Sequence, residues 1–212
     1  MHKNIKNLIY IQNEIKSKIF EYKIKDYNPN IIAISKTFKI DHILPLIEYG
    51  HIHFGENKIQ EAMDKWSEIK NNNIQIKLHM VGKLQTNKVK FAIKIFDYIH
   101  SVDNFKLAKK ISDEQKKNNK KPKIFIQINV GDEPQKSGIN KSEIKNFYNY
   151  CKNLNLNVTG VSLLNSAGVC ILSSLDIGFK PSAALRVTSN EPLINSYVDM
   201  GVKSLVRLFA SL

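Results

Sequence analysis

The sequence of 212 residues has only two cysteines, Cys151 and Cys170. Two thiols form neither a disulfide framework nor a set of metal ligands, so we expect a reducing, cytoplasmic environment. The first twenty residues lack the continuous apolar run of a signal peptide, and no apolar stretch reaches the length of a membrane span. These absences argue against secretion and membrane insertion.

Arginine is nearly absent, because only Arg186 and Arg207 stand among the 32 basic residues. A formal net charge of +13 would by itself favour a nucleic-acid partner. Arginine, however, is the residue that reads bases with paired hydrogen bonds. The surplus of lysine accompanies abundant isoleucine and asparagine, as an AT-rich coding sequence would produce. We therefore expect no specific nucleic-acid partner.

Several common functional motifs are also missing from the sequence. It contains no glycine-rich loop for phosphates or dinucleotides and no serine-nucleophile motif. Its six histidines have no spacing typical of a metal site. These gaps argue against nucleotide hydrolysis, nicotinamide chemistry, serine-hydrolase activity and a bound metal.

Short apolar runs alternate with amphipathic segments along the first 164 residues. The pattern predicts strands at 31–34, 51–55, 76–81, 98–102, 124–130 and 158–164, and helices at 2–24, 41–48, 57–70, 86–95, 104–119 and 141–154. Such alternation favours parallel βαβ units, and its length favours a single (β/α)₈ barrel, an α/β fold, over an open sheet. We expect one domain spanning 1–212.

The last quarter of the chain breaks this pattern. From residue 165 to 212 the periodicity is poor and turn-forming residues are scattered, so only a strand at 204–209 is expected. The last two βα units are therefore predicted to be shortened or irregular.

Lys36 is the strongest candidate for a chemical role, because it comes two residues after the end of the first predicted strand. Active sites of parallel barrels lie at the carboxyl ends of the strands. A lysine amine desolvated there could act as a nucleophile towards an aldehyde. The alternative is that Lys36 only ends the strand and reaches solvent.

Other polar residues also follow predicted strands. His53 and His79 could carry protons or could be satisfied core histidines. Asn57 could donate to a ligand or cap the helix after it.

Six segments in order carry a family resemblance. They are AISKT at 33–37, HFGENKIQE at 53–61, HMVGKLQTNK at 79–88, HSVD at 100–103, QINV at 127–130 and KSG at 136–138. Together they resemble the pyridoxal phosphate homeostasis proteins, whose single domain is similar to the N-terminal barrel of alanine racemase. The resemblance covers about residues 5–164, and 165–212 is degenerate.

The resemblance implies a cytoplasmic vitamin B6 carrier or regulator without catalytic turnover. It implies that Lys36 holds pyridoxal 5′-phosphate (PLP) as an aldimine and that Asn57 lies in a cofactor-side motif. PLP-dependent apo-enzymes are the expected acceptors, and the chain is expected to be a monomer or a weak dimer. No membrane partner is expected.

The late motifs of the family are altered in this sequence. In the family, two late segments bind the cofactor phosphate, and an arginine in the second faces the ring nitrogen of the cofactor. The first segment retains only Ser189 and a nearby acid in this sequence, and the second retains Arg207. Phe209 stands where the family has a glycine. The tail is therefore predicted to have diverged, with capture of the aldehyde retained and affinity for phosphate reduced.

Two alternatives remain at this point. One is a racemase- or decarboxylase-like enzyme that uses the same PLP site, with His53 or His79 as proton carrier. The other is a remnant, or a basic anion-binding protein, that no longer binds PLP. Amino-acid turnover identifies the first, and absence of a spectral change with PLP identifies the second.

Overall fold

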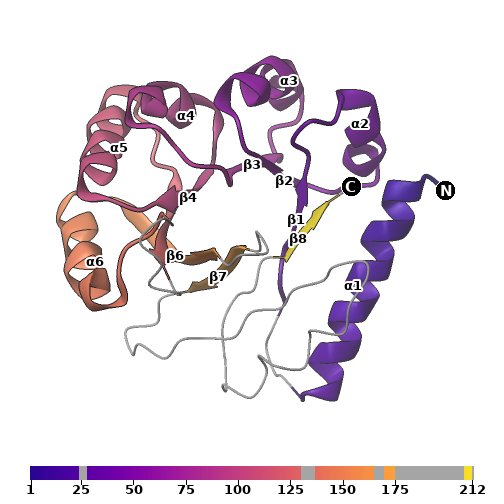
Figure 1. Ribbon diagram of the computed structural model, residues 1–212. Coiled ribbons are helices and arrows are strands. Elements are labelled where there is room, and N and C mark those ends of the chain that lie inside the picture. Colours follow the sequence, from indigo (N-terminus) through magenta and orange to yellow (C-terminus); the bar gives the residue numbers. More distant parts are fainter. Residues whose placement is uncertain (24–27, 130–136, 165–169, 175–207, 212) are drawn as a thin grey trace.

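The computed structural model describes residues 1–23, 28–129, 137–164, 170–174 and 208–211 (Figure 1). The helices are α1 (Lys3–Glu21), α2 (Ile40–Glu48), α3 (Ile59–Asn72), α4 (Val89–Ile95), α5 (Phe105–Asn118) and α6 (Ile144–Asn153). Short 3₁₀ turns, η1 (Thr86–Lys88) and η2 (Lys141–Glu143), precede α4 and α6. The strands are β1 (Ile31–Ile34), β2 (His53–Glu56), β3 (Lys77–Met80), β4 (Tyr98–Val102), β5 (Lys123–Asn129), β6 (Asn157–Leu164), β7 (Cys170–Ser174) and β8 (Leu208–Ser211).

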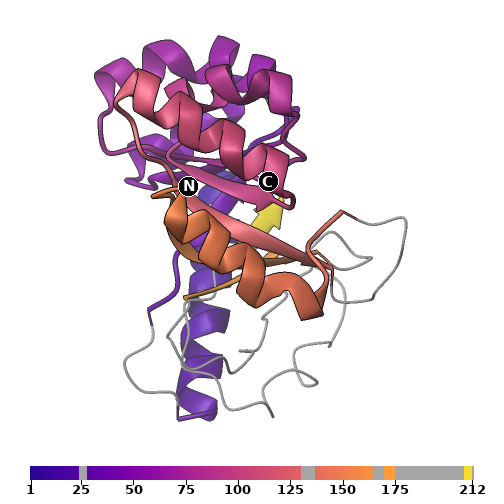
Figure 2. The ribbon, with the colours of Figure 1, turned by 90° about the vertical axis from the view of Figure 1, so that its left-hand side faces the viewer.

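All eight strands belong to one curved sheet in the order β7-β6-β5-β4-β3-β2-β1-β8. Strands β1 to β6 run parallel to one another, and β8 is parallel to β1. Helices α2 to α6 form an arc around the outside of this sheet (Figures 1 and 2). The two end strands, β7 and β8, approach within 8 Å between Cα atoms. The described residues thus form an α/β fold with the curvature of a barrel.

The two faces of the sheet pack against different groups, as β1 illustrates. Ile31 and Ala33 belong to the large apolar core beneath the helices. Ile32 and Ile34 belong instead to a small cluster with Tyr98 and Phe125. Because successive side chains of a strand point to opposite faces, this second cluster lies on the inner face of the sheet. A strand buried on both sides requires the continuous apolar run that the sequence has at 31–34.

Helix α1 packs beside the end of the arc, next to α2. Leu8 and Ile15 are its buried apolar side chains. The Asn4 side chain donates a hydrogen bond of 2.7 Å to the carbonyl oxygen of His42, which ties the start of α1 to α2. None of the described helices has the length and apolar character needed to cross a membrane.

The structure confirms the predicted alternation up to β6, and the strands after it depart from a regular barrel, as the predicted irregularity of the last two βα units implies. Strand β7 pairs antiparallel with β6, whereas a regular (β/α)₈ barrel has a parallel strand there. Only residues 165–169 separate the two strands, and a parallel connection needs a dozen or more residues. The final strand is Leu208–Ser211 where the sequence predicted 204–209. The single domain over 1–212 stays a prediction, because most of 165–212 lies outside the described residues.

Candidate functional site

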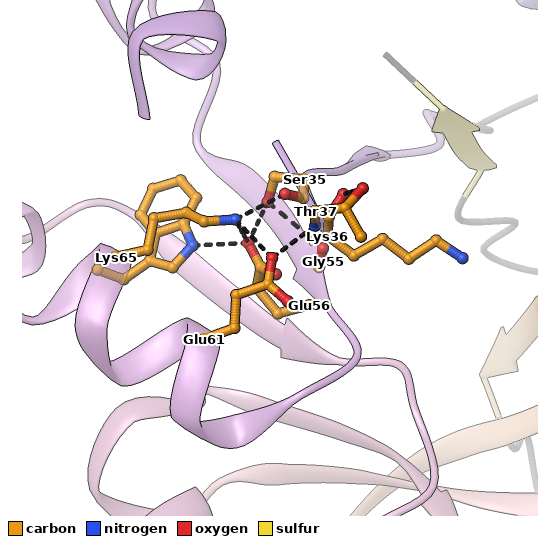
Figure 3. Close-up of polar contacts among 8 residues, drawn as sticks. Ser35, Lys36, Thr37, Gly55, Glu56, Glu61 and Lys65 are labelled. Carbon is orange, nitrogen blue, oxygen red and sulfur yellow. Dashed lines mark hydrogen bonds and ion pairs between the residues drawn. The ribbon is translucent and has the colours of Figure 1, made fainter. Parts of the chain in front are cut away.

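Lys36 lies where β1 ends, at the carboxyl edge of the sheet. Ile34 pairs with Gly55 of β2, and the Ser35 N–H donates to the Gly55 carbonyl oxygen at 2.9 Å, which extends the ladder by one residue. Lys36 and Thr37 then form a turn before α2. The Lys36 side chain is exposed and extends away from the polar groups beneath the turn (Figure 3).

Thr37 has an unusual backbone conformation, with φ at 66°. This left-handed region is unfavourable for a β-branched residue, so the surroundings must hold it there. The Thr37 N–H donates a hydrogen bond of 2.5 Å to Oε1 of Glu61, in the first turn of α3. The turn that carries Lys36 is therefore fixed in part by a side chain of a neighbouring helix.

Lys65, one turn further along α3, makes the second contact to this turn. Its Nζ donates to the carbonyl oxygen of Ser35 at 2.7 Å and forms an ion pair with Glu61 at 3.2 Å. We call Glu61 and Lys65 the α3 clamp. Its two members hold the backbone on both sides of Lys36, as Figure 3 shows.

Beneath the clamp lies the carboxylate of Glu56, which is fully buried. Its Oε1 accepts hydrogen bonds from the Ser35 hydroxyl at 2.7 Å, from the Trp66 indole N–H at 2.9 Å and from Lys65 at 3.0 Å. Its Oε2 is buried and has no partner among the residues that the structure describes. The Lys65 side chain is only 9% exposed, so this is a buried ion pair.

The electrostatics of Glu61 follow from these contacts. Burial acts to raise the pKa of Glu61, but the Thr37 N–H and the Lys65 ammonium outweigh it. The pKa of Glu61 is therefore held below its ordinary value of 4.5, which keeps the carboxylate charged at neutral pH.

Asn57 follows β2 as Lys36 follows β1, so both lie at the carboxyl ends of neighbouring strands. Asn57 is half-buried, and its backbone packs against Gly82, which follows β3. The N-cap position of α3 is occupied by Lys58, so the capping role considered for Asn57 is wrong. A role for Asn57 towards a ligand stays a prediction.

Three histidines form a hydrogen-bonded chain from β2 to β4. His53 Nδ1 lies 2.9 Å from His79 Nε2, and His79 Nδ1 lies 2.9 Å from His100 Nε2. His79 is fully buried and stacks on Tyr98 with ring centroids 4.2 Å apart. The structure thus joins both histidines that the sequence singled out to a third one.

The other two predicted site residues, Ser189 and Arg207, lie outside the described residues. Conversely, sequence reasoning gave no role to Glu61, Lys65 or Trp66. The sequence did contain a signal for Glu61 and Lys65. They are four residues apart on a predicted helix, and an acid and a lysine at that spacing can form an ion pair.

The family model described as "Alanine racemase, N-terminal domain" matches residues 18–166 of this chain. The match begins in α1 and ends just after β6, so it includes every described residue of the Lys36 site. It stops where the predicted alternation of strands and helices also stops.

The curated relatives named "Pyridoxal phosphate homeostasis protein" include proteins from Pasteurella multocida and Buchnera aphidicola. The one from Pasteurella multocida is 34% identical over 149 residues, which are 70% of this chain and 64% of the relative. The one from Buchnera aphidicola is 34% identical over an alignment of 167 positions, and the match covers 74% of this chain and 71% of the relative. The chain thus spans less than two thirds of the length of the first relative.

A solved structure of PipY from Synechococcus elongatus, described as having PLP bound, is 28% identical to this chain. The superposition has a TM-score of 0.59 and covers 65% of this chain and 63% of that one. Alanine racemase from Clostridium difficile superposes with a TM-score of 0.54 at 16% identity, covering 74% of this chain and 40% of that one. The second likeness concerns the fold alone.

Proposed function

Because the chain belongs to the alanine racemase N-terminal domain family, we propose that it binds PLP through Lys36 and serves the homeostasis of this cofactor in the cytoplasm. The names of the curated relatives and the PLP described in PipY support this proposal. The match to the first relative covers less than two thirds of its length, so the proposal is carried by the site itself.

The observation that carries the proposal is the placement of Lys36. Its amine projects from a turn held on both sides by α3, at the edge of the sheet where parallel barrels bind ligands. PLP supplies an aldehyde, with which an uncharged amine condenses to form a C=N bond as water leaves. The placement of Lys36 is compatible with binding PLP. Its side chain extends away from the carboxylates of Glu56 and Glu61 beneath the turn, so its amine is not directed at either of them.

We further propose a carrier without catalytic turnover. Lys36 would hold the aldehyde and release it when the amine of an apo-enzyme replaces that of Lys36. A second candidate, a PLP-dependent enzyme, is favoured by the hydrogen-bonded histidines at 53, 79 and 100, which could move protons. Turnover of amino acids by PLP-loaded protein separates the two, because a carrier gives none.

The test is an absorbance titration of the purified protein with PLP, followed by borohydride reduction and peptide mapping. We expect a band at about 420 nm, characteristic of a protonated C=N bond to this cofactor. The band and the reduced adduct should disappear in Lys36→Ala. They should persist in Lys39→Ala, which removes an exposed lysine after the same turn. A wild-type protein without the band, or a Lys36→Ala variant that keeps it, would contradict the proposal.

A further inference from the structure

We propose that Glu61 and Lys65, the α3 clamp, are positioning residues that set the direction in which the Lys36 amine meets an aldehyde. The inference rests on the proposed function, because it concerns how Lys36 is presented for that reaction. Both clamp residues act through the backbone, because their hydrogen bonds to the turn go to main-chain atoms of Ser35 and Thr37.

The peptide groups on either side of Lys36 are held separately. Lys65 donates to the Ser35 carbonyl oxygen, which belongs to the peptide before Lys36. Glu61 accepts from the Thr37 N–H, which belongs to the peptide after it. Rotation of either peptide changes φ or ψ of Lys36 and therefore the direction of its Cα–Cβ bond. When both peptide groups are held, the Cα–Cβ bond of Lys36 has a single direction.

The conformation of Thr37 indicates that the contact with Glu61 works against a backbone preference. A threonine with φ at 66° is strained and would relax towards an extended conformation if it were released. The Glu61 carboxylate supplies the acceptor that keeps the Thr37 N–H in place. Loss of this acceptor is therefore expected to turn the Lys36–Thr37 peptide and redirect Lys36.

The base of the clamp is fixed in the core. Lys65 is held by the buried Glu56, whose Oε1 also accepts from Trp66 and Ser35. Trp66 is fully buried against Phe54, with ring centroids 4.8 Å apart. The clamp thus connects the core under α3 with the turn that carries Lys36.

A simpler interpretation is that these contacts only dock α3 on the sheet. Three variants separate the two interpretations. Glu61→Ala removes the acceptor for Thr37, whereas Glu61→Gln keeps an amide oxygen in its place. Glu68→Ala is the matched control, because Glu68 is exposed on the same helix. The equilibrium constant for C=N formation at Lys36 is measured for each protein with PLP and with pyridoxal, which lacks the phosphate.

We expect Glu61→Ala to lower this constant about ten-fold with both aldehydes, because misplacing a reacting group is costly and the phosphate is not involved. Glu61→Gln and Glu68→Ala should stay within about two-fold of wild type, since neither removes the contact to Thr37. The inference is overturned if Glu61→Ala matches Glu68→Ala, if Glu61→Gln is impaired as strongly as Glu61→Ala, or if only PLP is affected.

A second measurement does not depend on any cofactor. The ¹³Cα and ¹³Cβ chemical shifts of Thr37 report whether its backbone is left-handed. We expect Glu61→Ala to move them to extended values and Glu61→Gln to leave them unchanged, whereas unchanged shifts in Glu61→Ala contradict the clamp. If the wild type reacts with neither aldehyde, the proposed function fails, and the shifts alone decide whether the clamp holds the turn.

Discussion

Gly82 lies directly against the backbone of Asn57. A Cβ atom on Gly82 would come within 2.4 Å of the Asn57 carbonyl oxygen and 2.9 Å of its Cα. The two residues follow adjacent strands, and the Val81 N–H donates to the Glu56 carbonyl oxygen at 3.0 Å just before them. Only glycine at position 82 allows these two backbone segments to approach this closely at the sheet edge that carries Lys36.

Gly82→Ala is therefore expected to destabilise the protein, because the clash is with backbone that cannot rotate away. We expect a loss near the upper end of about 1–3 kcal/mol in the free energy of unfolding, measured by urea denaturation. Gly50→Ala is the comparison, because its Cβ would meet nothing within 4 Å and only its φ of 92° opposes the change. That variant should lose about 1 kcal/mol. An equal or smaller loss in Gly82→Ala would show that the Asn57 backbone can shift freely.

Lys65→Met tests the buried ion pair beneath the site. Methionine fills similar space but leaves the Glu56 carboxylate buried without a cation. We expect a loss of about 3–5 kcal/mol in the free energy of unfolding. Adding Glu56→Gln should recover part of this loss, because a neutral amide can still accept from Trp66 and Ser35. A double variant no more stable than Lys65→Met would show that the charge of Glu56 is not the cause.

Much of the fold up to β6 could be predicted from the sequence, because strands buried on both faces appear as short apolar runs. The runs at 31–34 and 98–102 coincide with β1 and β4. The same signal made Lys36 a candidate, since a polar residue just after such a run lies at the edge of the sheet. The choice of Lys36 as the residue that holds PLP rested on the family resemblance.

Tertiary contacts decided what the sequence could not show. The direction of β7 depends on how short the connection from β6 is, and residues 165–169 have no periodicity that reveals it. The clamp joins Lys65 to Ser35, thirty positions apart, and is visible only once α3 is docked on the sheet. Ser189 and Arg207 stay predictions, because they lie outside the described residues.

The acid sensitivity of the protein should depend in part on Glu61. Its pKa is lower in the folded protein than the ordinary value of 4.5, so its contribution to stability is present above that value. The contribution is lost as the pH falls through the lower, folded pKa. As the pH falls from about 5, wild type should therefore lose stability more steeply than Glu61→Gln, which cannot titrate there.

Urea denaturation at several pH values in this range measures the difference. Glu68→Gln removes an exposed carboxylate from the same helix and should follow wild type. Parallel curves for wild type and Glu61→Gln would mean that the contacts of Glu61 with Thr37 and Lys65 do not favour its charged form.

The histidine chain leads to a prediction about tautomers. A neutral imidazole has one N–H, and His79 uses both of its ring nitrogens, one towards His53 and one towards His100. If His79 donates from Nε2, then His53 accepts at Nδ1 and His100 donates from Nε2, so all three rings carry their proton on Nε2. If His79 donates from Nδ1, all three carry it on Nδ1. The two hydrogen bonds therefore force one common tautomer while the rings are neutral.

Long-range ¹H–¹⁵N correlation spectra at a pH where the three rings are neutral distinguish the two tautomers for each ring. We expect the same pattern for His53, His79 and His100, and a mixed pattern would contradict the chain. Replacing His79 by phenylalanine keeps the stacking on Tyr98 but removes both hydrogen bonds. In that variant the tautomers of His53 and His100 should no longer be coupled, because each ring then chooses its proton position from its remaining contacts.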